Sequence, residues 1–350
     1  MESRTEIELN YKWTLKDAIF TKDKGKVFSC FACGGGSTMG YKLAGFDVIG
    51  CNEIDPKMMA CYVANHNPKY SFLEPIQTFK DRTDLPAELY ELDILDGSPP
   101  CSSFSMAGNR DKDWGKDKKF REGQQKQVLD TLFFDFIDLA KKLQPKVVIA
   151  ENVKGLLLGS ARKYYRKVHT DLSSAGYHVM AFLLNASKMG VPQRRERVFV
   201  VGIRKDLGID AHKISMNFNY PEIQYKDIRT ELGRIASPLY YQRWENRIKS
   251  DSSFGDITLR LNNTGSCFSD VFAHDNEPLP TLTSKGGVYD FESGHFVSDD
   301  TFKKAGSFPL DYDFLDNKPI YIIGMSVPPL MTARISEQIY LQVLSKNTTS

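Results

Sequence analysis

An apolar run that ends in two prolines and a cysteine constrains the fold of this chain more than any other stretch. Residues 92–96 (LDILD) have the composition of a buried parallel strand, and Pro99-Pro100 cannot extend a strand ladder because proline has no N–H. Cys101 is therefore expected at the carboxyl end of a strand, where open α/β sheets bind their ligands. This position favours a reactive nucleophile, and the alternative is a small apolar side chain that fills a loop.

The composition of the chain fits a globular intracellular protein. Its 350 residues are 41% hydrophobic and 26% charged, and no run of about eighteen apolar residues predicts a membrane span. The amino end is polar and acidic, so we expect a cytoplasmic protein with no membrane partner. The six cysteines are too scattered for a disulfide framework, and the single C-x-x-C pair, Cys30 and Cys33, has no second pair, so no metal is expected. A net charge of +2 neither requires nor excludes nucleic acid.

A strand, a glycine turn and a helix follow one another near the amino end. Residues 26–31 predict the strand, and Gly34-Gly35-Gly36 predicts a turn into a helix. Glycines in such a turn let the backbone approach a ligand at the helix N-terminus, although a merely flexible turn would have the same sequence. The next strand, residues 46–52, ends at Glu53, the position whose acid binds ribose hydroxyls in doubly wound folds. The alternative for Glu53 is a capping role at the following helix.

A second acid and two arginines are candidates for the same cleft. Glu151 follows the buried strand predicted over residues 146–150. Because successive parallel strands end at one edge of a sheet, we expect Glu151 and Cys101 to face one cleft. Arg195 and Arg197 precede a further apolar strand, where arginines clamp a phosphate or a carbonyl group. The alternative for these arginines is a surface charge cluster.

The alternation of strands and helices stops near residue 205. Residues 206–318 are richer in Asn, Ser, Tyr and Asp and hold only short apolar runs, which predicts a second, smaller, irregular and mainly β domain. Residues 319–329 return to an apolar strand-and-turn pattern, and residues 330–344 predict an amphipathic helix. We therefore expect a doubly wound, Rossmann-like α/β domain made of residues 1–205 and completed by residues 319–350.

The order of these motifs resembles the cytosine-C5 DNA methyltransferase family over most of the chain. Cys33, Pro75 and Met325 depart from the residues usual in that family. Each motif alone is modest, but their common order is hard to obtain by chance. The motifs are Phe31-Ala32-Cys33-Gly34-Gly35-Gly36, Glu53, Pro100-Cys101, Glu151-Asn152-Val153, Gln193-Arg194-Arg195-Glu196-Arg197, Thr281-Leu282-Thr283 and Gly324-Met325-Ser326-Val327.

The resemblance implies an S-adenosylmethionine-dependent methyltransferase domain and a target-recognition domain at residues 206–318. It implies double-stranded DNA as the partner of a monomeric enzyme in a bacterial or phage-infected host cytoplasm, with a cognate restriction endonuclease as a further partner in the same system. It assigns the binding of S-adenosylmethionine to Phe31, Ala32, Gly34, Gly35, Gly36, Glu53, Ile54, Ile76, Pro100, Leu132, Ser326 and Val327.

The resemblance also assigns the catalytic roles. Cys101 would add to C6 of a flipped-out cytosine, which makes C5 nucleophilic enough to accept a methyl group. Glu151 would bond the N3 edge of the ring and share a proton with it. Arg195 and Arg197 would hold the base carbonyl and the loop that carries the cysteine.

Three other functions compete with this interpretation. Relatives with a similar Pro-Pro-Cys loop methylate cytosine in transfer RNA, but the irregular segment of roughly a hundred residues favours DNA because it offers a surface that reads sequence. A nicotinamide-dependent oxidoreductase would explain the glycine turn and the acid, yet the turn is not Gly-x-Gly-x-x-Gly and Cys101 would have no role. A catalytically dead DNA-binding relative would not need Cys101, Glu151 and Arg197.

Overall fold

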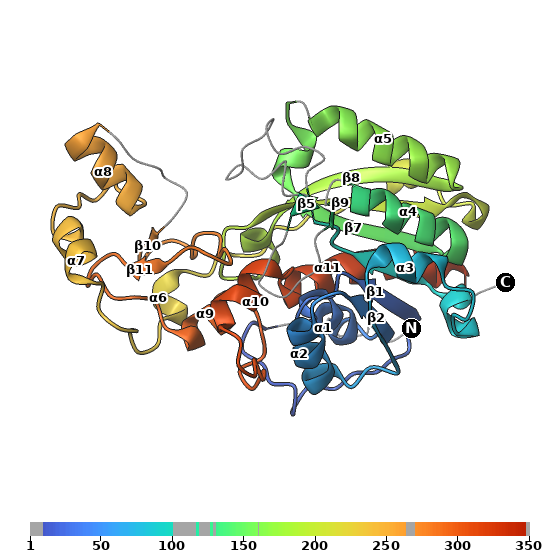
Figure 1. Ribbon diagram of the computed structural model, residues 1–350, viewed down its shortest axis with the longest axis horizontal. Helices are drawn as coiled ribbons and strands as arrows, with labels where there is room; N and C mark the ends of the chain where they lie inside the picture. The colour runs from blue at the N-terminus through green and yellow to red at the C-terminus, as the bar shows by residue number, and fades with distance from the viewer. Residues whose placement is uncertain are drawn as a thin grey trace.

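The computed structural model describes residues 10–100, 131–159, 161–263 and 270–347, and the backbone of residues 117–118 and 127–128. A large lobe contains the main sheet, and a smaller lobe that carries α7 and α8 extends from it (Figure 1). In the described part of the chain, no helix is long and apolar enough to cross a membrane. No group of three or more His, Cys, Asp and Glu side chains among those residues could hold a metal ion.

The main sheet has seven strands in the order β3-β2-β1-β4-β7-β9-β8. Neighbours from β3 to β7 are parallel, whereas β9 is antiparallel to both β7 and β8. A separate two-stranded sheet pairs β5 (Asp117–Lys118) with β6 (Gln127–Val128). The strands of the main sheet are β1 (Lys26–Cys30), β2 (Asp47–Glu53), β3 (Tyr70–Leu73), β4 (Ile94–Gly97), β7 (Val147–Val153), β8 (Tyr177–Asn185) and β9 (Glu196–Arg204).

Helices cover both faces of the sheet, which confirms the doubly wound α/β prediction. Adjacent strand residues point to opposite faces, so Phe28 and Leu95 join the core under α3, α4 and α5, whereas Val27 and Ile94 join the core under α1 and α11. The helices of this lobe are α1 (Gly36–Leu43), α2 (Pro56–His66), α3 (Ile76–Asp81), α4 (Leu132–Leu143), α5 (Ala161–Ser174), α10 (Pro319–Met325) and α11 (Pro329–Ile339), with a π-helix at Tyr340–Leu344. Short 3-10 helices lie at Ala87–Glu91, Lys154–Leu157, Ala186–Met189, Lys205–Leu207, Ala211–Lys213 and Ser345–Asn347.

The direction of the chain through the sheet reverses between β1 and β4. From β1 the chain moves outward through β2 to β3, and it then returns to form β4 on the other side of β1. In open α/β sheets the crevice outside the carboxyl ends of the strands at such a reversal is where ligands bind. The glycine turn after β1 and the Pro-Pro-Cys sequence after β4 both start at this point.

The carboxyl-terminal segment packs on the first half of the sheet lobe, as predicted, but its first element is a helix. Pro319 is the first residue of α10, where its fixed φ favours a helix, and Pro328 follows its end. The strand predicted within residues 319–329 is therefore wrong, because a short apolar run does not distinguish a strand from a buried helix. The following helix α11 packs tightly on α1: a Cβ at Gly40 would lie 2.4 Å from the carbonyl oxygen of Pro329.

The smaller lobe is not mainly β, so that part of the prediction is wrong. Among its described residues only two strands form, β10 (Val271–Ala273) and β11 (Val288–Asp290), each of three residues. Short apolar runs between turn residues predict more strands, but in the structure these runs contribute individual aromatic side chains to a small core around Trp244, Phe254 and Phe272. The helices are α6 (Tyr225–Ile228), α7 (Pro238–Trp244), α8 (Phe254–Asn262) and α9 (Asp299–Ala305).

Candidate active site

The end of β4 is held against β7 at the residues that lead to the predicted nucleophile. The side chain of Asn152 donates a hydrogen bond from Nδ2 to the carbonyl oxygen of Pro99 at 3.1 Å. Gly97 leaves no room for a side chain, since a Cβ there would lie 2.6 Å from the ring of Phe136. Pro100 is half-buried and is the last described residue of this stretch; Cys101 itself lies outside the described residues.

Glu151 and Arg197 form a mostly buried ion pair at the carboxyl end of β7. Arg197 lies opposite Val153 in the antiparallel register, so its side chain is on the same face as Glu151, two residues back along β7. The Nε atom of Arg197 is 3.0 Å from Oε1 of Glu151, and the side chains are 15% and 12% exposed. Burial lowers the pKa of the Arg197 guanidinium, and the neighbouring carboxylate opposes that change.

Arg195 holds backbone from two distant segments. Its Nη1 atom donates to the carbonyl oxygen of Leu282 at 3.0 Å and its Nη2 atom to that of Gly324 at 3.1 Å. The side chain of Gln193 acts similarly, since it donates to the carbonyl oxygen of Ala305 and accepts from the N–H of Leu282. The structure therefore pairs Arg197 directly with Glu151, whereas the guanidinium of Arg195 bonds backbone carbonyl groups.

The glycine turn between β1 and α1 has an unusual backbone. Phe31, Cys33 and Gly35 all have a positive φ, of 55°, 48° and 79°. Gly35 stands at the N-cap position of α1 and offers no side chain to the N–H groups of the first helical turn. Such N–H groups are suited to hold an anionic group of a ligand.

Glu53 holds this turn through its carboxylate. Oε2 accepts from the N–H of Cys33 at 2.8 Å, and Oε1 accepts from the N–H groups of Ile54 and Asp55 at 2.8 Å each. Burial raises the pKa of Glu53, and the three backbone hydrogen bonds oppose that change. The N-cap of α2 is Asp55, so the capping alternative does not describe Glu53. A carboxylate has about four acceptor sites, which leaves one for a ligand hydroxyl.

The remaining predicted cofactor residues fall into three groups. Ser326 and Val327 lie against the glycine turn, because a Cβ at Gly36 would be 2.4 Å from the carbonyl oxygen of Val327 and 2.6 Å from Cβ of Ser326. Ile76 and Leu132 are buried in the core under α3 and α4. Ala32, Gly34, Gly35 and Gly36 form the turn, with Phe31 packed near Phe136 and Ile54 directly after Glu53.

Sequence reasoning missed Asp96, a buried carboxylate on β4. It accepts hydrogen bonds from the hydroxyls of Ser29, Ser37 and Tyr41. Burial raises the pKa of Asp96 to about 6, the three hydroxyl donors lower it, and the charge of Glu151 raises it. An acid inside an otherwise apolar central strand is the signal in the sequence that could identify it.

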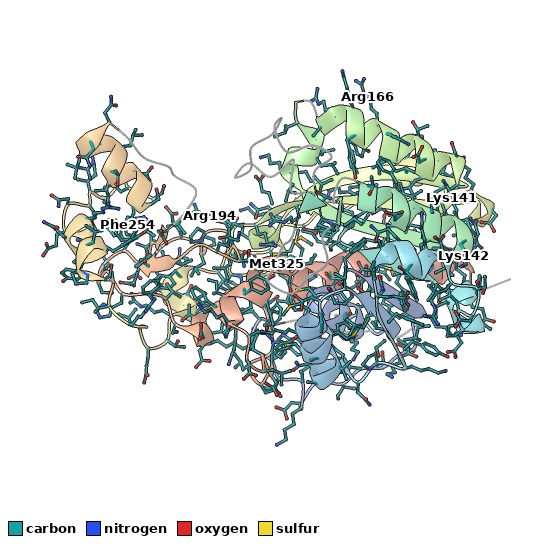
Figure 2. The ribbon with its side chains drawn as sticks, in the orientation of Figure 1. Lys141, Lys142, Arg166, Arg194, Phe254 and Met325 are labelled. Atoms are coloured by element: carbon teal, nitrogen blue, oxygen red, sulfur yellow. The ribbon has the colours of Figure 1, made fainter. Side chains whose placement is uncertain are left out.

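The smaller lobe contains a cleft of about 890 Å³ near Arg194. Arg194 and Met325 lie where the two lobes meet (Figure 2), and Arg194 forms an ion pair with Glu277 at 2.9 Å. Basic and acidic side chains and aromatic rings all line the cleft. Its lining includes Arg194, Lys249, Ser250, Ser252, Phe272, His274, Asp275, Asn276, Glu277, Phe291 and Glu292.

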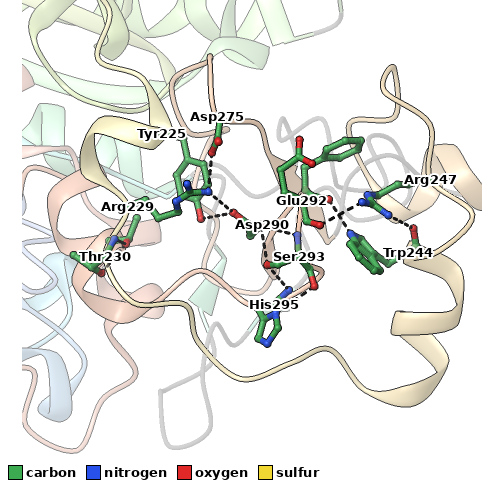
Figure 3. A network of polar contacts seen from close by, with 12 residues as sticks. Tyr225, Arg229, Thr230, Trp244, Arg247, Asp275, Asp290, Glu292, Ser293 and His295 are labelled. Atoms are coloured by element: carbon green, nitrogen blue, oxygen red, sulfur yellow. Dashed lines mark hydrogen bonds and ion pairs between the residues drawn. The ribbon is translucent and has the colours of Figure 1, made fainter.

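A polar network fixes the wall of this cleft (Figure 3). Asp290, at the end of β11, accepts from the hydroxyl of Tyr225 at 3.1 Å and from the N–H of Ser293 at 2.8 Å. It also pairs with Nη1 of Arg229 at 3.2 Å. The indole N–H of Trp244 donates to the carbonyl oxygen of the next residue, Phe291, at 2.9 Å. The wall residues that follow β11 are therefore held from several sides.

The strand order of the main sheet and the site at the carboxyl ends of its strands are those of an α/β methyltransferase fold. Solved structures support this class at low identity. A protein designated a DNA modification methyltransferase encoded within an Escherichia coli prophage aligns with a TM-score of 0.65 and 20% identity, over 91% of this chain and 99% of that one. A Schizosaccharomyces pombe Dnmt2 methyltransferase aligns with a TM-score of 0.57 and 15% identity, over 93% of this chain and 99% of that one.

Residues 25–285 match the model of the C-5 cytosine-specific DNA methylase family, so the chain belongs to that family. The predicted family is confirmed. Type II methyltransferase M.FnuDI of Fusobacterium nucleatum is 37% identical over 56% of this chain and 50% of its own length. Type II methyltransferase M.NgoFVII of Neisseria gonorrhoeae is 26% identical over 93% of this chain and 89% of its own length. The chain thus spans about half the length of M.FnuDI and most of M.NgoFVII.

Proposed function

We propose that this chain is a DNA (cytosine-5-)-methyltransferase that transfers a methyl group from S-adenosylmethionine to C5 of a cytosine in duplex DNA. One observation carries the proposal beyond family membership. The mostly buried Glu151–Arg197 pair lies at the carboxyl end of β7, next to the end of β4, which Asn152 holds through Pro99 just before Cys101. A carboxyl group held there by an arginine suits a group that must meet the edge of a base while a thiolate attacks the ring.

The residues around the glycine turn fit S-adenosylmethionine. The remaining acceptor site of Glu53 suits a ribose hydroxyl, and the uncapped N-terminus of α1 suits the carboxylate of the methionine moiety. Ile54, directly after Glu53, is half-buried and offers apolar surface for the adenine, whereas Ile76 is buried in the core. When bound, S-adenosylmethionine supplies the methyl group.

The chain's own groups would carry the remaining chemistry. The thiolate of Cys101 adds to C6, and the electron pair of the C5–C6 double bond becomes available at C5 for methylation. Glu151 bonds the N3 edge and shares a proton with it, which balances the charge on the ring, and Arg197 keeps that carboxyl in position. Loss of the C5 proton then restores the double bond and expels Cys101. The base must leave the duplex stack first, at a cost of roughly a few kcal/mol.

We assign target recognition to residues 206–318 and catalysis to residues 1–205 with 319–350. The cleft beside Arg194 combines basic, acidic and amide side chains, which are the types that contact phosphates and base edges. Several relatives are type II methyltransferases, and a cognate restriction endonuclease is a further proposed partner. We expect a monomer on duplex DNA.

Methyl incorporation from labelled S-adenosylmethionine tests the proposal. The wild-type chain should label duplex DNA and not transfer RNA, and Cys101→Ser should abolish labelling while it still binds the cofactor. Duplex DNA with 5-fluorocytosine should trap a covalent adduct at Cys101, since fluorine cannot leave C5 as a proton does. Labelling of transfer RNA alone, or wild-type turnover by Cys101→Ser, would overturn the assignment.

A further inference from the structure

A single buried carboxylate joins the two strands and the helix that meet at the reversal of the sheet. Asp96 of β4 lies directly opposite Ser29 of β1 in the parallel register. Its Oδ2 atom accepts from Oγ of Ser29 and from Oγ of Ser37, both at 2.7 Å, and its Oδ1 atom accepts from the hydroxyl of Tyr41 at 3.1 Å. The side chain is 4% exposed.

This carboxylate has hydroxyl donors instead of a cation. Within the described residues, no Lys, Arg or His side chain forms an ion pair with Asp96. A buried carboxylate without a cation is unfavourable for folding, and three hydroxyl donors offset only part of that penalty. An apolar side chain at this position of a central strand would avoid the penalty altogether. The role of Asp96 therefore lies in the segments that it connects.

The three donors belong to the segments that the proposed reaction must hold in register. Ser37 and Tyr41 lie on α1, in the two turns directly after the glycine turn, and Ser29 lies on β1 just before that turn. Asp96 itself is one residue from the end of β4, which continues through Pro99 and Pro100 to Cys101. One side chain thus connects the turn proposed to hold the methyl donor with the strand that carries the nucleophile.

We propose that Asp96 is a positioning residue for methyl transfer, which fixes the glycine turn and the start of α1 relative to the strand that leads to Cys101. This inference rests on the proposed function, because it takes the turn as the S-adenosylmethionine site. Asp96 acts through Ser37, Tyr41 and Ser29 and does not touch the ligand. Its loss should therefore weaken the binding of any ligand that uses the turn, whatever the charge of that ligand.

Calorimetric binding of S-adenosylmethionine and of its neutral product, S-adenosylhomocysteine, to the full chain tests this inference. In Asp96→Asn the Kd for both ligands should rise by about tenfold, as expected for lost charge-assisted hydrogen bonds. Asp93→Asn is the matched control, because Asp93 precedes the same strand at its opposite end and bonds Lys26 and Lys146 there. Its Kd values should stay within about twofold of wild type.

Single-donor variants keep the test decisive if Asp96→Asn fails to fold. Ser37→Ala should raise both Kd values by about threefold, and Ser37→Thr, which retains a hydroxyl, should restore them. Wild-type Kd values in Asp96→Asn or Ser37→Ala would overturn the inference, and so would weakening for S-adenosylmethionine alone, which would mean direct attraction to its sulfonium. The binding of both ligands is measured without nucleic acid, so it does not depend on methylation of DNA. A wild-type chain that binds both ligands but methylates no DNA would overturn the proposed function. The Kd values of the variants would still decide this inference.

Discussion

Arg197 reaches Glu151 across an antiparallel strand pair, with its Nε atom 3.0 Å from Oε1 of the carboxylate. The reversal of β9 makes this contact possible, because it brings the amino end of β9 to the carboxyl end of β7. A parallel strand in the same place would put its own carboxyl end there instead. The reversed strand therefore delivers an arginine from the amino end of β9 to a site otherwise built at the carboxyl ends of strands.

Removing the charge of Glu151 should impair catalysis without loss of cofactor binding. Glu151→Gln should lower kcat for DNA methylation by about a hundredfold or more, because the amide cannot share a proton with the ring. Arg197→Lys should have a smaller effect of about tenfold, since an ammonium group cannot reproduce the guanidinium geometry. Steady-state methylation and calorimetric cofactor binding measure the two effects.

The neighbouring exposed pair provides the control for this prediction. Lys154 and Glu196 are 2.8 Å apart, and their side chains are 44% and 45% exposed. Lys154→Met should therefore leave kcat within about twofold of wild type, since exposed pairs contribute little. A Glu151→Gln variant with more than about a tenth of wild-type kcat would contradict the assigned role.

Arg195 should matter for stability more than for chemistry. Arg195→Met leaves the carbonyl oxygens of Leu282 and Gly324 without their donor, which should lower the free energy of unfolding by about 2–4 kcal/mol in urea titrations. Arg194→Met removes an exposed ion pair with Glu277 and should cost about 0.5 kcal/mol. Equal losses of unfolding free energy in the two variants would show that the buried hydrogen bonds of Arg195 stabilise the fold no more than the exposed ion pair of Arg194.

Local patterns predicted the parts of the site that depend on strand ends. Glu151 and the glycine turn lie at the carboxyl ends of strands whose apolar runs are visible in the sequence, although β7 runs on to Val153 and includes Glu151. The different contacts of Arg195 and Arg197 could not be predicted, since they depend on the antiparallel register of β9 and on carbonyl groups from residues 282 and 324. Asp96 was missed for the same reason, because its donors come from β1 and α1.

Gly35 should not tolerate even an alanine. Its φ is +79°, and a Cβ there would lie 2.2 Å from Nε2 of His66. Gly190 is a matched control, with a φ of +77° and nothing within 4 Å of an added Cβ. Gly190→Ala should cost about 1 kcal/mol of unfolding free energy through backbone strain, whereas Gly35→Ala should cost at least about 2 kcal/mol more through the clash. Equal losses in urea titrations would rule out the close approach to His66.

His66 should make the protein sensitive to mild acid. Burial, with a smaller contribution from Lys42, lowers the pKa of His66 from 6.5 to about 3, while its hydrogen bond to the carbonyl oxygen of Gly34 opposes the change. The unfolded chain therefore binds a proton between these values that the folded chain does not. The contribution of His66 to stability is complete above about pH 6.5 and is lost as the pH falls toward about 3.

Comparison with a neutral variant measures this contribution. Between pH 7.5 and pH 5.5 the free energy of unfolding of the wild type should fall by about 1.4 kcal/mol more than that of His66→Gln. Glutamine retains an N–H donor for Gly34 but does not titrate, so the other titrating groups cancel in the difference. Parallel pH profiles of the two proteins would show that His66 accepts a proton in the folded state.

The contribution of Asp96 to stability should change with pH in the opposite direction to that of His66. Burial raises its pKa from 3.8 to about 6, with a further increase from Glu151, while the hydroxyls of Ser37, Ser29 and Tyr41 lower it. Between these two pKa values the folded state keeps a proton that the unfolded state has released. The contribution of Asp96 therefore becomes less favourable as the pH rises toward about 6 and is constant above that.

The stability of Asp96→Asn relative to wild type should consequently increase with pH. Urea titrations at pH 5 and pH 8 should give a difference between the two proteins that is about 1.4 kcal/mol more favourable to the variant at pH 8. Tyr41→Phe removes one of the donors that favour the charged form, so the same loss of stability should extend to higher pH in that variant. A pH-independent difference between Asp96→Asn and wild type would show that Asp96 titrates equally in both states. A variant that gains stability at pH 8 and yet binds S-adenosylmethionine more weakly would identify Asp96 as a residue retained for the site at the expense of the fold.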